Sequence, residues 1–417
     1  MKRRRERFLK NRSSENRAGM ALNTRAETAL AGVLREAVRE KKAAGVSVLL
    51  IRDGETVLSL QEGMADRERG VRISADTVFR LHSMTKPVLA AAAFRLMEQG
   101  RLGLEDPVSR YLPEYEKLCT ASADGQTVSA ERPMRIYHLL NMTSGLVYPD
   151  ESTLPGIRTG EAFRDIMSGL STREAARRFA ACPLAFEPGR GWGYGVSADV
   201  LGAVLEKIAD LRLGELLRRE ILDPLGMSDT SFGVPTPRRE RLAAVYEECP
   251  GRPETLARYE AGEIGLDHDA PEDPHFESGG AGLCGTLTDY GRFAKMLLRE
   301  GLVSEDSFEG ARLLRSETVR YMTGTGLAGL QQRAFDAVTM FSLGRYTYGS
   351  LMRKCLRDDV PPRIARRGEY GWGGQDGTDF VNFPAENAAL LIGMQKRNAR
   401  MYSLGKKIRA AVLSELI

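Results

Sequence analysis

A serine and a lysine three residues apart carry the clearest chemical signal in this 417-residue chain. The S-x-x-K motif from Ser83 to Lys86 lies between an extended stretch, 77–82, and the helix-forming residues 88–97. A hydroxyl is a poor nucleophile at neutral pH and needs a base nearby, and residues three apart on a helix share a face. Because Pro87 is tolerated only near a first helical turn, the helix begins close to Ser83, whose hydroxyl then lies by its positive end. The spacing therefore predicts a nucleophilic Ser83 with Lys86 as a base.

The same four-residue pattern recurs at Ser403 to Lys406, so the motif needs support from its surroundings. Gly405 interrupts this second copy, and the basic residues after it are typical of the exposed face of a C-terminal helix. We interpret Ser403 as a surface residue without a catalytic role. An isolated S-x-x-K is more often a helix cap beside a solvated lysine than a catalytic pair.

The composition is that of a globular chain with a large core, since 42% of the residues are hydrophobic and 28% are charged. The formal net charge of +4 comes from the N-terminus, because the first twelve residues hold seven Lys or Arg and one Glu. The rest of the chain is slightly acidic. We expect residues 1–20 to be a disordered basic arm, and we predict no nucleic-acid partner.

We expect neither an export signal nor a membrane span. Its charged start is followed by no apolar stretch of signal-peptide length, and no segment approaches 18 uncharged apolar residues. The five cysteines are odd in number and scattered, which argues against a disulfide framework and against a zinc site. These features favour a reduced, cytoplasmic protein.

Hydrophobic patterns predict strands at both ends of the chain and helices in its middle. We expect strands over 45–52, 55–60, 369–374, 378–383 and 388–395. We expect helices over 24–41, 135–142, 171–181, 198–209, 212–222, 288–300 and 403–416. The prediction is one domain, 21–417, whose ends (about 21–95 and 335–417) form an antiparallel sheet around a mostly helical insertion (about 96–334).

Two further patterns suggest a cofactor or a metal and fail on context. Gly280 to Gly285 matches G-x-G-x-x-G, but it follows an acidic, proline-rich segment where a dinucleotide site needs a strand. We interpret it as a close-packed glycine loop before a helix capped by Thr288. His268 and His275 lie among acidic residues without the spacing of a metal site. No cofactor and no metal are therefore expected.

The chain also offers no histidine triad. His82 directly precedes Ser83, but adjacent residues of an extended segment point to opposite faces, so we expect His82 to pack instead of acting as the base. Tyr194 ends a glycine-rich loop that leads into the helix 198–209. By itself it fits a packing aromatic equally well. A further motif is needed to give Tyr194 a role.

That motif is supplied by the order of three short segments. The S-x-x-K at Ser83, then Tyr194-Gly195-Val196 and then Trp372-Gly373-Gly374 resemble the motifs of the penicillin-recognising serine hydrolases. The resemblance is closest to family VIII carboxylesterases and class C β-lactamase-like proteins, and it extends through 138–146, 186–189, 223–227 and 279–283. It implies a β-lactamase/transpeptidase-like α/β (α+β) fold, with an antiparallel sheet flanked by helices and a helical inserted subdomain.

Two positions depart from the lactamase pattern. Val196 stands where Y-x-N has an amide, and Trp372-Gly373-Gly374 replaces the K-T-G strand motif. Both changes remove polar groups that hold the lactam, and a buried polar ligand group left unpaired costs about 1 to 3 kcal/mol. The W-G-G form is similar to that of the esterases in this group and of related acyltransferases. Efficient lactam cleavage is therefore not expected.

The mechanistic hypothesis makes Ser83 the nucleophile and Lys86 with Tyr194 a coupled base. Lysine and tyrosine each hold a proton at neutral pH in isolation, but an adjacent ammonium stabilises a phenolate and desolvation disfavours an ammonium. Two such neighbours can therefore share one proton. The backbone N–H of Ser83 and, by the resemblance, that of Gln375 on the strand after Gly374 would bind the oxyanion.

Substrate would lie between apolar walls. We expect Trp372 and Val196 to form these walls, with Gly373 and Gly374 keeping the strand edge uncrowded. The sequence thus predicts a serine hydrolase that forms an acyl-enzyme on Ser83, first of all a carboxylesterase acting on small or medium acyl esters. β-Lactamase, D-amino-acid peptidase or acyltransferase activity is the alternative, followed by a non-catalytic binding domain. No oligomeric state is predicted.

Overall fold

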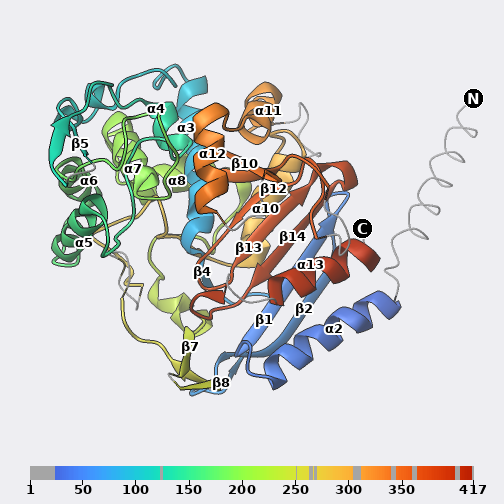
Figure 1. The fold of residues 1–417 in the computed structure, drawn as a ribbon. Helices are drawn as coiled ribbons and strands as arrows, with labels where there is room; N and C mark the ends of the chain where they lie inside the picture. Colours follow the sequence, from blue (N-terminus) through green and yellow to red (C-terminus); the bar gives the residue numbers. More distant parts are fainter. Residues whose placement is uncertain are drawn as a thin grey trace, which may run out of the picture.

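The two ends of the chain build one antiparallel sheet, and the middle of the chain supplies most of the helices (Figure 1). The computed structural model describes residues 24–122, 125–249, 251–262, 266, 270–303, 311–339, 344–358, 364–399 and 404–415. The expected basic arm (1–20), Ser403 and His268 lie outside the described residues.

Within the described residues the large sheet has eight strands, in the order β10-β11-β12-β13-β14-β1-β2-β3. At its centre β1 (Gly45–Arg52) pairs antiparallel with both β2 (Glu55–Asp66) and β14 (Ala388–Gly393). The remaining strands are β3 (Val71–Arg72), β10 (Tyr346–Gly349), β11 (Met352–Cys355), β12 (Tyr370–Gly373) and β13 (Asp379–Phe383). The prediction that both chain ends share one antiparallel sheet is confirmed.

Helices cover both faces of this sheet. Helices α2 (Thr24–Arg39) and α13 (Leu404–Glu415) lie together on one face, and α10 (Leu287–Leu298) lies on the other (Figure 1). Leu50 belongs to the hydrophobic cluster of α2 and α13, whereas its neighbour Ile51 packs against α10. Since alternate residues of β1 are buried on opposite faces, this strand is mostly apolar, with Ser47 as its buried polar residue and Arg52 at its end.

A group of helices beside the sheet forms the other part of the molecule (Figure 1). It contains α4 (Ile136–Leu140), α5 (Leu154–Ile166), α6 (Thr172–Ala180), α7 (Ser197–Ala209), α8 (Leu213–Leu217), the π-helical turn η4 (Arg218–Leu222) and α9 (Asp223–Leu225). Helices α11 (Ser316–Gly324) and α12 (Gly329–Val338) follow α10, and two small hairpins pair β5 (Cys119–Ala121) with β6 (Thr127–Ser129) and β7 (Tyr246–Cys249) with β8 (Arg252–Arg258). The boundaries drawn from the sequence between sheet and helical insertion stay a prediction.

The segment around Ser83 differs from expectation in its last extended residues. Strand β4 (Phe79–Arg80) pairs with β9 (Cys284–Gly285), and the chain then turns through a 3-10 helix, η1 (His82–Met84), into α3 (Thr85–Glu98). The extended stretch therefore ends at Arg80 instead of His82. The turn requires a left-handed backbone at His82, whose φ is +46°.

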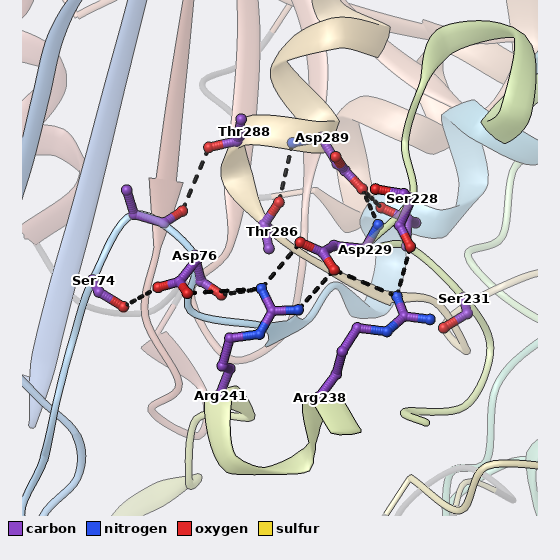
Figure 2. A network of polar contacts seen from close by, with 12 residues as sticks. Ser74, Asp76, Ser228, Asp229, Ser231, Arg238, Arg241, Thr286, Thr288 and Asp289 are labelled. Carbon is purple, nitrogen blue, oxygen red and sulfur yellow. Dashed lines mark hydrogen bonds and ion pairs between the residues drawn. The ribbon is translucent and has the colours of Figure 1, made fainter. Parts of the chain in front are cut away.

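The cap of α10 also differs from expectation. Thr286, and not Thr288, caps the helix, because the Thr286 hydroxyl accepts a hydrogen bond from the backbone N–H of Asp289 at 3.1 Å (Figure 2). Thr288 lies in the first turn, where its hydroxyl donates to the carbonyl of Ala75 at 3.4 Å. Two threonines two residues apart offer the same cap chemistry, and the actual helix start decides between them.

Among the described residues, no helix has the length and apolar character that crossing a bilayer requires. In the same residues, no group of three or more His, Cys, Asp and Glu side chains is arranged to hold a metal ion. The cytoplasmic location inferred from the sequence stays a prediction.

Candidate active site

Ser83 lies in the middle of the 3-10 turn between β4 and α3, and its side chain is partly exposed. Contacts from α10 and from the glycine loop hold this turn. The Tyr290 hydroxyl donates to the carbonyl of Met84 at 2.8 Å, and the Leu283 N–H donates to the hydroxyl of Thr85 at 3.0 Å. The predicted nucleophile is thus held on a rigid turn at a helix N-terminus.

The structure brings Ser83, Lys86 and Tyr194 together. The Lys86 ammonium donates to Ser83 Oγ at 3.1 Å, and the hydroxyl of Tyr194 shares a hydrogen bond with Ser83 Oγ at 2.7 Å. Lys86 Nζ also lies 4.7 Å from the centre of the Tyr194 ring. Lys86 is fully buried, whereas Ser83 and Tyr194 are partly exposed. A buried amine therefore meets two partly exposed groups, a hydroxyl and a phenol.

Lys86 has two further partners that sequence reasoning missed. Its ammonium donates to the hydroxyl of Tyr148 at 3.1 Å and to the carbonyl of Gly280 at 2.7 Å. With Ser83 these acceptors account for the three N–H bonds of an ammonium. Tyr148 lies two residues after the segment 138–146 that carries part of the family resemblance, but no spacing rule connects it to Lys86. Gly280 belongs to the glycine pattern that we interpreted as a close-packed loop.

Asp199 is the third group that the sequence did not reveal. It lies in the first turn of α7, is 2% exposed, and accepts a hydrogen bond from the Gly280 N–H at 3.1 Å and another from the Ser278 hydroxyl. Burial raises the pKa of Asp199, although the Ser278 hydroxyl and the positive charge of Lys86 act in the opposite direction. Asp199 thus fixes the loop whose carbonyl contacts Lys86.

Tyr194 is held by a tight backbone contact and by an indole. A side chain at Gly195 would place its Cβ 2.3 Å from the carbonyl oxygen of Leu146, so only glycine allows these segments to approach. The indole N–H of Trp372 donates to the Tyr194 hydroxyl at 3.0 Å. A donor at this position favours negative charge on the tyrosine oxygen.

The predicted substrate walls are largely covered. The exposed fraction of the residue is 1% for Val196 and 2% for Trp372, and Gly373 and Gly374 are buried. Trp372 in this structure orients Tyr194, and Val196 lies in the core next to α7. Contact of these four residues with a substrate stays a prediction.

Gln375 lies in a turn and not on a strand, which corrects the sequence expectation. Strand β12 ends at Gly373, and the chain turns through residues 374–377 before β13. This turn lies against the nucleophile turn, because a Cβ at Gly374 would be 2.6 Å from the carbonyl oxygen of Leu81. The Thr378 hydroxyl also donates to that carbonyl, at 3.1 Å. The oxyanion role of the Ser83 and Gln375 N–H groups stays a prediction.

A cavity of about 370 Å³ adjoins the nucleophile turn. Its lining is mainly apolar, with Phe232, Leu283 and Phe276 among its residues, and His82 and Asp376 contribute polar groups.

Comparison with known proteins assigns the class that this fold and site suggest. Residues 30–413 match the sequence profile of the family described as Beta-lactamase, so the chain belongs to that family. It has the β-lactamase/transpeptidase fold expected from the motifs, and it is a serine hydrolase of this family.

Particular relatives include esterases. The chain is 35% identical over 300 residues to esterase EstB of Burkholderia gladioli, covering 68% of this chain and 73% of EstB. It is 33% identical over 370 residues to protein Rv1367c of Mycobacterium tuberculosis, covering 86% of this chain and 88% of that protein. Among solved structures it is similar to EstCE1, described as a hydrolase with promiscuous acyltransferase activity, with a TM-score of 0.77, 27% identity and coverage of 93% and 98%.

Proposed function

We propose that the protein is a carboxylesterase that cleaves small or medium acyl esters through an acyl-enzyme on Ser83. The observation that carries this proposal is the approach of Lys86 Nζ and the Tyr194 hydroxyl to Ser83 Oγ, at 3.1 and 2.7 Å. Histidine chemistry is not needed, because an amine and a phenol already lie within proton-transfer distance of the nucleophile.

In the first step Ser83 Oγ attacks the ester carbonyl carbon. A new C–O bond forms and the carbonyl π electrons move to its oxygen. The serine proton passes to the coupled base, in which Lys86 and Tyr194 share one proton beforehand and so have one vacant proton site. The oxyanion would accept hydrogen bonds from the backbone N–H groups of Ser83 and Gln375, and one such donor is worth about 3 to 4 kcal/mol.

The tetrahedral intermediate then collapses. The bond between the acyl carbon and the alcohol oxygen breaks, and the coupled base returns its proton to the departing alcohol. Water then attacks the acyl carbon and gives one proton to the base; the bond between the acyl carbon and Ser83 Oγ breaks, and the base returns that proton to Oγ, which releases the acid and free Ser83. Contacts from Trp372 to Tyr194 and from Tyr148 and Gly280 to Lys86 keep the base in place throughout.

Esters are favoured over lactams as substrates for two reasons. Val196 provides no amide at the third position of the Y-x-N motif, and its buried side chain packs in the core. The second reason is the similarity to EstB and EstCE1, which are described as an esterase and a hydrolase.

The test compares hydrolysis of p-nitrophenyl acetate and butyrate with turnover of nitrocefin and of a D-Ala-D-Ala peptide. We expect ester hydrolysis to dominate and Ser83→Ala to abolish it. Ser403→Ala, in the second S-x-x-K, is the matched control and should keep full activity. Retained ester turnover in Ser83→Ala would refute the acyl-enzyme, and preferred cleavage of nitrocefin or of the peptide would refute the substrate class.

A further inference from the structure

A buried pair, His82 and Asp376, connects the two turns that carry the proposed oxyanion donors. His82 Nε2 and Asp376 Oδ2 are 3.0 Å apart, and the side chains are 9% and 4% exposed. His82 is the residue before Ser83, and Asp376 is the residue after Gln375. The pair therefore joins, across 294 positions of the sequence, the immediate neighbours of both N–H groups.

The backbone of His82 is in a conformation that needs support. Its φ of +46° lies in the left-handed region, which residues other than glycine seldom adopt. Such conformations persist where surrounding contacts over-determine them, and they cluster at functional sites. This conformation places the imidazole on Asp376 while Ser83 faces Lys86 and Tyr194.

The hydrogen bonding indicates how the pair is protonated. Burial acts to raise the pKa of Asp376, but the hydrogen bond from His82, with Arg397 and Arg80 nearby, lowers it overall. Asp376 is therefore a carboxylate that accepts from Nε2–H. His82 Nδ1 and Asp376 Oδ1 have no partner among the described residues.

Other contacts fix the turn of Asp376 from its far side. The Asp376 carbonyl accepts from the N–H of Lys396 at 2.9 Å, and Gly374 lies against Leu81 and His82. The side-chain pair adds a hydrogen bond between this turn and His82, the residue directly before the nucleophile.

We propose that His82 and Asp376 are positioning residues that set the spacing between the N–H groups of Ser83 and Gln375. This inference rests on the proposed function. Neither side chain is assigned to proton transfer; the pair acts through the two backbone groups that would bind the oxyanion. Displacement of such a donor by about 1 Å is enough to cost on the order of a hundredfold in rate.

The test measures kcat, KM and thermal midpoint for Asp376→Ala and Asp376→Asn with p-nitrophenyl butyrate. Asp376→Ala should lower kcat about 10- to 100-fold with KM changed less than about threefold, since the defect lies in oxyanion binding. Asp376→Asn keeps the shape and one acceptor oxygen, and it should recover much of the loss. Labelling of Ser83 by a p-nitrophenyl phosphonate, which also develops charge on oxygen, should slow in parallel with kcat.

A matched control lies just before β12, the strand that leads into the turn of Asp376. Glu369 precedes β12 and forms a buried pair with Arg409 at 2.6 Å, with exposed fractions of 1% and 8%. Glu369→Ala should lower the thermal midpoint and leave kcat close to the wild-type value.

Three outcomes would overturn the inference while leaving the esterase proposal intact. In the first, Asp376→Ala loses stability as Glu369→Ala does but keeps kcat, so the pair is structural only. In the second, KM rises with kcat unchanged, so the pair contacts substrate from the cavity. In the third, Asp376→Asn folds but is no better than a folded Asp376→Ala. Absence of ester hydrolysis in the wild type would instead refute the proposed function itself.

Discussion

Two helices of this protein follow paired short strands but carry different groups at their N-termini. Helices α3 and α10 each follow one of the paired two-residue strands, β4 and β9. At α10, Thr286 caps the first turn, and the Asp289 carboxylate accepts from the N–H of Asp229 at 2.7 Å and the hydroxyl of Thr230 at 3.1 Å. Figure 2 shows this network continuing through Asp229 to Arg238 and Arg241.

The first turn of α3 carries no acidic side chain, and in the described part of the chain no side chain caps it. The polar side chains next to it are Ser83, Lys86 and Thr85, and the Thr85 hydroxyl accepts from the Leu283 N–H. The carboxylate of Asp289 therefore offsets the positive dipole at the N-terminus of α10. The N-terminus of α3 has no such carboxylate in its first turn, so its dipole can stabilise negative charge that develops during a reaction. The difference separates a helix start that stabilises the fold from one that can serve catalysis.

The largest expected effect is on the chemistry at α3. Tyr194→Phe or Lys86→Met should reduce ester turnover by about 10²- to 10⁴-fold, the usual contribution of a general base, with little change in thermal midpoint. The measurement is kcat/KM on p-nitrophenyl butyrate beside a melting curve. Tyr115→Phe is the matched control, because its buried hydroxyl bonds the Ala176 carbonyl in the helical region. If Tyr115→Phe lost as much activity as Tyr194→Phe, the assignment of Tyr194 to the base would be wrong.

A smaller effect, on stability and not on turnover, is expected at α10. Asp289→Ala leaves the N–H of Asp229 and the hydroxyl of Thr230 without their acceptor, which costs about 1 to 3 kcal/mol. Urea denaturation should show this loss, and kcat per folded molecule should stay unchanged. A fall in kcat would mean that the start of α10 also controls the site, through the bond from Tyr290 to Met84.

A still smaller effect on stability is expected at the N-cap of α10, where two threonines can be compared directly. Thr286→Ala should destabilise the protein by about 1 kcal/mol, since it removes the acceptor for the N–H of Asp289. Thr288→Ala changes the same residue type two positions on, where the hydroxyl makes a long bond to Ala75, and should stay within about 0.5 kcal/mol of the wild type. Equal losses by urea denaturation would contradict the assignment of Thr286 as the cap.

The spacing of neighbouring residues in the sequence predicted several individual strands and helices. Strand β1 and the helices α6 and α7 follow the expected ranges closely, whereas β2 continues to Asp66, beyond the expected end at residue 60. Ser83 lies just before α3 because Pro87 restricts where a helix can begin. Helix α5 was missed because Pro155 and Gly156 stand in its first turn, where they interrupt the usual helical pattern.

Contacts between distant segments could not be derived from spacing. Tyr148 and Gly280 reach Lys86 from segments 62 and 194 residues away, and Asp376 reaches His82 from 294. Motif order connected Tyr194 to Ser83, but no motif includes these other groups. The adjacency argument treated His82 as part of an extended strand, and its left-handed turn invalidates that premise. The catalytic roles of Ser83, Lys86 and Tyr194 stay predictions that the variants above test.

The smallest expected effect comes from the ion pair of Asp229 with Arg241, which adjoins the start of α10. The hydrogen bond from Arg241 lowers the pKa of Asp229 below its ordinary value of 3.8, against the opposing effect of partial burial. The folded protein then binds fewer protons than the unfolded chain in this range, so the stabilisation is present above pH 3.8 and is lost as the pH falls through the folded-state pKa. Because the Asp229 side chain is 30% exposed, its share should be below about 1 kcal/mol. Between about pH 5 and 3, urea denaturation of Asp229→Asn should show a shallower loss of stability than the wild type, and Arg241→Gln should flatten the same part of the curve. If stability fell with pH in the same way in both variants and in the wild type, the ion pair of Asp229 with Arg241 would contribute nothing measurable, and Asp289 alone would stabilise the start of α10.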